Sequence, residues 1–327
     1  MASIEQYWYR RGPLHILLYP LSLVFRALVF LRRGAYRCGM LQQTHISVPV
    51  IVVGNITVGG TGKTPLTLAI TRQLIALGRH PLIVSRGHAG SALIPRAVDL
   101  GDSATEVGDE PRLMAQRNLC PIWIGKNRAA AAQAALAANP ECDVIVCDDG
   151  LQHYRLARNF EIAVVDGIRR FGNGWTLPAG PLREPLSRLN SVNAIVCNGG
   201  KASAREYAMT LHGSVFHNLR NPKQTRKAEN FSTLKCHAIA GIGHPKRFFD
   251  HLTTLGITCI THPFPDHHPF RAEDLDFAEC DALLLTEKDA VKCDAFADER
   301  YWVLRVDAQV DPALIDDLMR KISPHGR

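Results

Sequence analysis

The sequence lacks the cysteine pattern of a metal site or a disulfide framework. Its nine cysteines are scattered, odd in number, and include no Cys-x-x-Cys pair. Cys142 and Cys147 lie on one predicted strand, a spacing that suits neither a zinc site nor a disulfide. These absences argue against a small secreted domain and favour free thiols in a reducing cytosol.

Nucleic-acid signatures and internal repeats are also missing. The net charge of +7 suits an anionic partner, whether nucleotide, phospholipid or nucleic acid, but no arginine-rich tail or aromatic-plus-basic pattern accompanies it. We therefore expect no nucleic-acid partner, and no obligate protein partner is evident. Apolar residues make up 46% and charged residues 21% of the 327 residues, as in folded globular proteins of one or two domains.

One long apolar run, residues 14–31, lies near the N-terminus. Arginines flank it on both sides, at Arg10, Arg11, Arg32, Arg33 and Arg37. A signal peptide is not expected, because no small-residue cleavage site follows the run. A membrane span is possible by length, but polar residues interrupt the run.

These polar residues share one face of a predicted helix. His15, Tyr19, Ser22, Arg26 and Arg33 recur at helical spacing, and the opposite face is apolar. The pattern is typical of a helix in a membrane interface, with its cations toward anionic headgroups. We therefore expect residues 1–40 to form a membrane-associating helix. A transmembrane span and a helix packed on the protein's own core are the alternatives.

Strands and helices are predicted to alternate over residues 41–205. Continuous apolar runs predict strands covered on both faces, and helical periodicity separates them. This order predicts an α/β fold with a doubly wound parallel sheet of the P-loop NTPase type. The predicted strands are 48–53, 82–84, 144–147, 162–165 and 194–197, and the predicted helices are 63–77, 110–117 and 128–138.

The remaining chain predicts a second, smaller α/β domain. Residues 206–235 are polar and irregular, and we expect a linker there. Residues 236–327 repeat the α/β pattern, with strands at 238–240, 282–285 and 301–306 and a helix at 248–255. The stretch 172–185 has no periodicity but contains Gly, Pro, Trp and Arg, and a long loop of this kind is often functional.

A glycine-rich loop follows the first predicted strand and opens the first predicted helix. It reads Val58-Gly59-Gly60-Thr61-Gly62-Lys63-Thr64-Pro65. Its backbone N–H groups suit the phosphates of ATP, Lys63 suits the β- and γ-phosphates, and Thr64 suits Mg²⁺. The loop is a variant Walker A motif, because Thr57 stands where the usual pattern has its first glycine.

A partner for this loop is an apolar strand that ends in acidic residues. Residues 144–147 are followed by Asp148 and Asp149, which would emerge at the carboxyl edge of the sheet. Carboxylates placed there can hold Mg²⁺ directly or through water. A strand that ends in Asp-Asp-Gly is also a common turn, so the metal role depends on the neighbouring P-loop.

Taken together, the motifs resemble the tetraacyldisaccharide 4′-kinase family, the lipid A 4′-kinases of Gram-negative bacteria. The resemblance covers nearly the whole chain and departs at His88, where the family has an aromatic residue, and over residues 200–235. It rests on the P-loop together with Ser85-Arg86-Gly87, Gly108-Asp109-Glu110-Pro111, Asp148-Asp149-Gly150-Leu151-Gln152-His153, Leu177-Pro178-Ala179-Gly180-Pro181-Leu182-Arg183-Glu184, Ala240-Gly241-Ile242-Gly243 and Thr286-Glu287-Lys288-Asp289.

The resemblance implies transfer of the γ-phosphoryl group of ATP to the 4′ hydroxyl of a tetraacylated glucosamine disaccharide 1-phosphate. It places this reaction at the cytoplasmic face of the inner membrane, in a cleft between two α/β/α domains joined by a β-ribbon. It also implies a catalytic Asp–His dyad. The aspartate corresponds to Asp109, and the histidine corresponds to His267, with adjacent His268 as the alternative.

Four further charged or polar residues are candidates for phosphate, ribose or substrate contacts: Arg128, His153, Arg183 and Glu184. Each is equally suited to a salt bridge or a helix cap. Two rival functions share the P-loop. A membrane-recruited switch ATPase would carry lysine where this chain has Val58, and a kinase of soluble metabolites would have no use for the apolar N-terminal helix.

Overall fold

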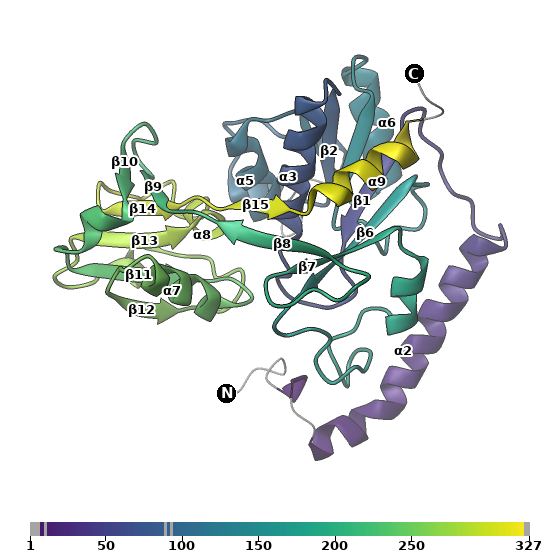
Figure 1. Cartoon of the computed structure of the whole chain (residues 1–327), viewed down its shortest axis with the longest axis horizontal. Helices are drawn as coiled ribbons and strands as arrows, with labels where there is room; N and C mark the ends of the chain where they lie inside the picture. Colours follow the sequence, from purple (N-terminus) through teal and green to yellow (C-terminus); the bar gives the residue numbers. More distant parts are fainter. Residues whose placement is uncertain (1–6, 10–11, 88–89, 92–93, 324–327) are drawn as a thin grey trace.

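The computed structural model describes residues 7–9, 12–87, 90–91 and 94–323. It contains two β-sheets, each covered by helices, and a long N-terminal helix on the outside of the first (Figure 1). The α/β prediction with a second, smaller sheet and an N-terminal apolar helix is confirmed.

The first sheet has nine strands, and the strands from β8 to β4 are parallel. Strand β1 lies at its centre, and every residue of β1 is buried because both faces are covered. From one edge to the other the strands are β15 (Asp307–Val310), β8 (Tyr207–His212), β7 (Ala194–Asn198), β6 (Phe160–Asp166), β1 (Val50–Gly54), β5 (Val144–Asp148), β2 (Pro81–Ser85), β4 (Ile122–Ile124) and β3 (Arg96–Ala97).

Different helices cover the two faces of the first sheet. Helices α3 (Lys63–Ala76), α5 (Asp109–Arg117) and α9 (Pro312–Ile322) place Leu, Ile and Met side chains against one face. The alanine-rich α6 (Arg128–Ala138) covers the other face, where small side chains let the helix approach the strands closely. The short α4 (Ala104–Val107) and η1 (Leu186–Ser191) complete this part.

The second sheet has six strands in the order β10 (Thr225–Lys227), β9 (Val215–Asn218), β14 (Tyr301–Leu304), β13 (Ala282–Thr286), β11 (Cys236–Ala240) and β12 (Cys259–Pro263). Helix α7 (Pro245–Thr254) packs Phe248 and Leu252 on one face. The other face is covered by η3 (Ala272–Leu275) and the chain around α8 (Glu287–Ala290), and η2 (Ala228–Phe231) closes one end.

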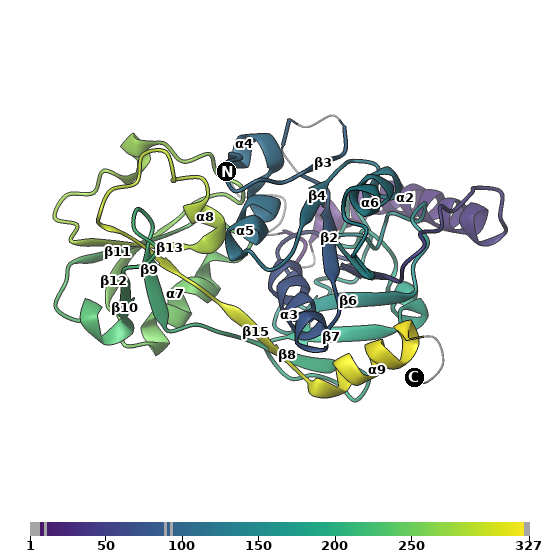
Figure 2. The same cartoon turned by 90° about the horizontal axis from the view of Figure 1, so that it is seen from above.

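Strands β8 and β15 form a two-stranded antiparallel connection between the sheets (Figures 1 and 2). The chain leaves the first sheet through β8 and returns through β15, so α9 packs on the first sheet although it falls in the range expected for the second domain. The expected linker, residues 206–235, instead contains β8, β9 and β10. These are short strands with a solvated face, and β8 alternates exposed and buried residues, which makes the sequence look irregular.

Helix α2 (Pro13–Arg37) lies along the outside of the first sheet, away from the second sheet (Figure 2). Leu14–Arg37 is long and apolar enough to cross a membrane, and only 11% of its most apolar window is buried. The exposed side chains are large and apolar; they include Ile16 (71%), Leu17 (74%), Leu28 (61%), Phe30 (74%) and Leu31 (65%).

The polar face of α2 does not have the expected orientation toward lipid headgroups. His15 and Ser22 are buried against the protein. The Ser22 hydroxyl donates to Thr176 O (2.8 Å) and accepts from Ala179 N–H (3.0 Å). The ring of Tyr19 packs on Trp175, with centroids 4.7 Å apart. The part of the polar stripe from His15 to Ser22 therefore docks α2 onto the loop 172–185, whereas Arg26 and the apolar face remain exposed.

Replacing Ser22 with Val should lower the free energy of unfolding, because the Ala179 N–H and the Thr176 carbonyl would lose their buried partner. We expect a loss of about 1–3 kcal/mol, measured by chemical or thermal unfolding in detergent. The matched control is Ala27→Val, which adds a valine to the exposed face of the same helix. Equal losses in the two variants would show that Ser22 does not dock the helix.

Candidate active site

The P-loop folds around the carboxyl end of β1 and opens α3. Gly62 is the residue before α3, with a φ of 94°, and a Cβ there would lie 2.2 Å from Asn198 Nδ2, so only glycine fits. The first N–H groups of α3 have no partners within the helix, and they form an anion-binding end. Thr61 is buried, and its Oγ1 has no hydrogen bond within the described part of the chain.

Two carboxylates from the end of β5 face Lys63. Asp149 Oδ1 lies 3.5 Å from Lys63 Nζ, and its Oδ2 lies 3.5 Å from Arg183 Nη1. Asp148 is fully buried, and its Oδ1 accepts a hydrogen bond from Thr67 Oγ1 at 3.0 Å. The structure therefore brings together the predicted P-loop lysine and the predicted acidic pair.

The two carboxylates differ in protonation. Burial acts to raise the pKa of Asp149, but the charges of Lys63, Arg183 and Arg128 outweigh it and lower the pKa to about 2. Asp148 is more deeply buried, and burial together with the charges of Glu110 and Asp149 raises its pKa. Asp149 is thus a negative charge at neutral pH, and a cation bound beside Asp148 would favour its ionised form.

The acidic pair fits a magnesium ion that is completed by phosphates. Asp148 Oδ2 and Asp149 Oδ1 are buried oxygens without a hydrogen bond among the described residues, so both are available as ligands. No group of three or more His, Cys, Asp or Glu side chains forms a metal cage in the described part of the chain. Mg²⁺ is commonly held by one or two carboxylates plus substrate phosphates, which is the donor set found here.

Asp109 and His267 meet although they belong to different sheets. Asp109 is the first residue of α5, and its Oδ2 lies 3.0 Å from His267 Nδ1. Burial acts to raise the pKa of Asp109, but the hydrogen bond from His267 and the charges of Lys292 and Lys288 lower it below its usual value. Because Asp109 is then ionised, His267 Nδ1 carries the proton and Nε2 is the acceptor nitrogen.

The adjacent histidine has a different environment. His268 Nε2 lies 3.2 Å from Asp274 Oδ2, and its ring packs beside Phe264 and Phe270. The contacts of His268 therefore lie within the second domain, whereas His267 contacts Asp109 of the first.

Lys288 reaches the acceptor nitrogen of the dyad. Its Nζ lies 3.2 Å from His267 Nε2 and donates to Asp266 Oδ1 at 3.1 Å. Burial acts to lower the pKa of Lys288, but the carboxylates of Glu110, Asp266 and Asp109 raise it, so the ammonium is charged. Lys288 thus adds a second cation to the pocket that Lys63 also lines.

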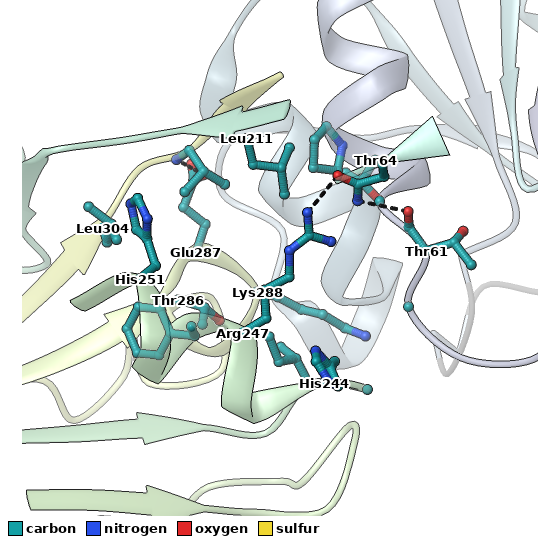
Figure 3. Close-up of a pocket in the computed structure, with 18 of the residues that line it drawn as sticks. Thr61, Thr64, Leu211, His244, Arg247, His251, Thr286, Glu287, Lys288 and Leu304 are labelled. Carbon is teal, nitrogen blue, oxygen red and sulfur yellow. Dashed lines mark hydrogen bonds between the residues drawn. The ribbon is translucent and has the colours of Figure 1, made fainter. Parts of the chain in front are cut away.

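A pocket of about 450 Å³ separates the P-loop from the second domain. One wall is the P-loop and the start of α3, and the other carries His244, Arg247, His251 and Lys288. Arg247 points toward the P-loop, whereas His251 lies beside Leu304, away from it (Figure 3). Leu211, Phe248, Leu304 and Val306 add apolar side chains to the lining, together with His251 and Glu287. The pocket thus combines phosphate-binding groups with apolar side chains that suit a heterocyclic base.

Two polar links join the P-loop to the second domain. Arg169 donates to Gly60 O (2.7 Å) in the P-loop and to Gly243 O (3.1 Å) beyond β11. Arg247 donates to Asn198 Oδ1 (2.8 Å), and Asn198 donates to Thr61 O (2.9 Å) (Figure 3). These contacts fix the P-loop tip against the second domain.

The other predicted contact residues have varied surroundings. Arg128 is buried and donates to Gly125 O (2.9 Å), so its guanidinium supports the main chain behind the acidic pair. Burial, followed by the charges of Arg128 and Arg86, lowers the pKa of His153 to about 4, so this ring is neutral. Glu184 is buried, and it accepts from Gln152 Nε2 (2.9 Å) and from Tyr154. His88 lies outside the described residues.

The loop 172–185 connects α2 to the P-loop. Beyond its contacts with Ser22, its Pro181 O accepts from Val58 N–H (2.9 Å), and Arg183 N–H donates to Ile56 O (2.7 Å). Arg183, which faces Asp149, is therefore held by the P-loop backbone itself. The sequence of this loop has no periodicity because its backbone is bonded to α2 on one side and to the P-loop on the other, and most of it forms no helix or strand.

Sequence reasoning assigned no role to Arg169, Asn198, Arg247 or Lys288. Lys288 lies in the Thr-Glu-Lys-Asp motif that supported the family resemblance, so a signal was present for it. The other three have none, because their contacts join segments that are far apart in the chain and lie side by side only after folding.

A phosphate-binding loop at the carboxyl edge of a parallel sheet, with an acidic pair ending the neighbouring strand, defines a P-loop nucleotide-binding protein. The family model described as Tetraacyldisaccharide-1-P 4′-kinase matches residues 14–323. The chain belongs to this family and is an ATP-dependent kinase, as the sequence predicted.

Similar proteins span the whole chain. The tetraacyldisaccharide 4′-kinase of Azoarcus sp. (strain BH72) is 48% identical, over 100% of this chain and 97% of that protein. Its counterpart in Methylobacillus flagellatus is 45% identical, over 98% of this chain and 96% of that protein. A crystal structure of the "apo" form of LpxK from Aquifex aeolicus in complex with ATP has a TM-score of 0.78 and 26% identity, covering 95% of this chain and 100% of that chain.

Replacing Lys63 with Ala should abolish most phosphoryl transfer, because its ammonium neutralises charge that grows on the phosphates during transfer. Circular dichroism and thermal unfolding should show an intact fold. The matched control is Lys126→Ala, at an exposed lysine outside the pocket, which should keep full activity. Unaltered turnover in a folded Lys63→Ala protein would overturn the P-loop interpretation.

Proposed function

We propose that this chain transfers the γ-phosphoryl group of ATP to the 4′ hydroxyl of a tetraacylated glucosamine disaccharide 1-phosphate, a step of lipid A biosynthesis. We place the reaction at the cytoplasmic face of the bacterial inner membrane. The observation that carries the proposal is the 3.0 Å contact of Asp109 with His267, which joins both domains beside a nucleotide-sized pocket.

ATP would lie across this pocket with its phosphates on the P-loop. The α3 N-terminus and Lys63 would bind the phosphates, and the base would lie against the apolar side chains of Leu211 and Phe248. Thr64, Asp148 and Asp149 would hold Mg²⁺, which supplies charge neutralisation at the β- and γ-phosphates when bound. Arg183, already beside Asp149, would add a further positive charge at the same edge.

The dyad is suited to accept the proton of the attacking hydroxyl. Asp109 holds the proton of His267 on Nδ1, which leaves Nε2 as the base. In this structure Lys288 donates to Nε2, and a substrate hydroxyl would replace it there. The displaced ammonium would remain near the transferred group, between the carboxylates of Glu110 and Asp266. Closure of the two domains on this site would also exclude water and limit wasteful hydrolysis of ATP.

The outward face of α2 supports a membrane-bound enzyme. Large apolar side chains are exposed from Leu14 to Leu31, while His15 and Ser22 of the polar face are buried against the protein. A contiguous exposed apolar surface of this kind is typical of proteins that enter the membrane interface. An acylated acceptor would reach the active site from the same membrane surface.

The reaction is tested by incubating the pure protein with γ-labelled ATP and one of three acceptors. We expect label to move to the tetraacylated disaccharide 1-phosphate and not to water or to soluble sugars. Release of labelled phosphate without transfer would favour a switch ATPase. Labelling of a soluble sugar at a comparable rate would favour a kinase of soluble metabolites.

Asp109→Ala and His267→Ala should each lower kcat roughly a hundredfold or more, with little change in the KM for ATP, because they remove a general base but no nucleotide contact. The double variant should be little slower than either single one, because the two residues act as a unit. The matched control is His268→Ala, whose ring lies within the second domain. The dyad would be refuted if the losses of kcat in the two single variants multiplied in the double variant. It would also be refuted if His267→Ala kept the full rate while His268→Ala was inactive.

A further inference from the structure

A second polar cavity lies at the carboxyl end of α2. It has a volume of about 430 Å³ and is lined by arginine, tyrosine and amide side chains. The arginines come from three segments: Arg33 and Arg37 from α2, Arg158 from the loop before β6, and Arg188 from η1. No step of the proposed reaction uses this cavity, which we call the α2 basic pocket.

The α2 basic pocket contains more positive than negative charge. Glu161 accepts from both Arg158 (2.9 Å) and Arg188 (2.5 Å). Glu184 is shared by Arg33 (4.0 Å) and Arg188 (3.4 Å). Both carboxylates are therefore already engaged by arginines.

Arg37 is exposed and makes no ion pair within the part of the chain that the structure describes. Arg32 lies nearby, with its guanidinium 5.9 Å from the centre of the Tyr154 ring. The pocket is thus left with unneutralised cations around a space large enough for an anionic group.

The α2 basic pocket is separate from the phosphoacceptor site. Its wall includes Asn159 and Asn193, which cap the beginnings of strands: Asn159 Oδ1 accepts from Val50 N–H (2.9 Å), and Asn193 Oδ1 accepts from Glu161 N–H (2.8 Å). The P-loop lies at the opposite, carboxyl edge of the same parallel strands. A ligand in the pocket is therefore not in line with the γ-phosphate.

The pocket adjoins the apolar surface of α2. Phe30 and Leu31, among the most exposed side chains of the helix, lie within two turns of Arg33 and Arg37. A helix that enters the interface with its apolar face places arginines at its end at the level of the lipid headgroups. Arginine is suited to phosphate oxygens because its planar guanidinium can donate two parallel hydrogen bonds.

We propose that the α2 basic pocket binds the phosphate of an anionic membrane phospholipid, at a site distinct from the substrate site. The headgroup phosphate accepts from Arg37 and Arg33, and the acyl chains lie along the apolar face of α2. The inference rests on the proposed membrane placement of this helix, but not on the identity of the phosphoacceptor.

The test measures binding of the full-length protein to vesicles of phosphatidylcholine alone and of phosphatidylcholine with phosphatidylglycerol, without substrate. Wild type should bind the anionic vesicles more tightly. Arg37→Gln should weaken this binding roughly tenfold or more, the loss expected for charge-assisted hydrogen bonds. The matched control is Arg26→Gln, an exposed arginine of the same helix outside the pocket, which should cost about fivefold or less, as for a diffuse charge.

Each other outcome has a defined meaning. Equal losses for Arg37→Gln and Arg26→Gln would refute the pocket in favour of diffuse charge. In another outcome, inorganic phosphate alone stabilises wild type as much as the lipid does and fails to stabilise Arg37→Gln. That result would make free phosphate the ligand and refute the lipid assignment. A raised substrate KM in Arg37→Gln with unchanged vesicle binding would assign the pocket to the substrate and likewise refute it.

The membrane placement itself is tested by Leu17→Glu on the exposed face. This variant should weaken binding to both vesicle types and keep the preference for the anionic one. Failure of wild type to bind either vesicle would refute the membrane placement and the pocket together. Labelling of detergent-dispersed substrate by the same preparation would show that the kinase proposal still holds.

Discussion

Arg169 ties the two halves of this molecule together at the tip of the P-loop. One guanidinium donates to a P-loop carbonyl and to a carbonyl of the second domain, and it is held in place by Asp166 (3.1 Å). The approach is so close that a Cβ on Gly243 would lie 2.8 Å from Gly60 N. Asp109 and His267 come from opposite sides of this contact and meet at 3.0 Å. Helix α5, which carries Asp109, is also joined directly to the second domain, because Arg117 donates to Glu287 (2.6 Å) and to Val306 O (2.8 Å).

The site gathers charges that would be costly to bury alone. Lys63, Arg183 and Asp149 neutralise one another in part, while Asp148 has a buried oxygen without a hydrogen bond within the described chain. Such an arrangement is stable only because each charge has a partner close by, and it becomes fully satisfied when a cation and phosphates enter. In the proposed reaction, these charges would already be in place before ATP binds, which would reduce the reorganisation required during transfer.

Much of this could be predicted from local sequence. Strands β1 and β5 are continuous apolar runs, and α6 has the predicted bounds, because buried parallel strands and an alanine-rich helix have strong local signals. Strands β8 and β15 have one solvated face and were not predicted as members of the first sheet. In the site, Lys63 and the acidic pair follow from motif and position, whereas the dyad required the family resemblance. Arg169 and Arg247 act through contacts between segments that no local pattern connects.

The orientation of the N-terminal helix α2 also could not be predicted from the sequence. Helical periodicity correctly separates a polar from an apolar face of α2, but periodicity alone does not say which face meets the protein. Two residues of the polar face do, since Ser22 is buried and hydrogen-bonded to the loop 172–185, and His15 is buried with its ring beside Trp175 of that loop. That loop is bonded in turn to the P-loop backbone at Val58 and Ile56. The exposed apolar helix α2 and the P-loop are therefore at two ends of one hydrogen-bonded path. With α2 in the membrane interface, as proposed, its depth would set the height of the active site above the bilayer, which would suit an acceptor that arrives from the membrane.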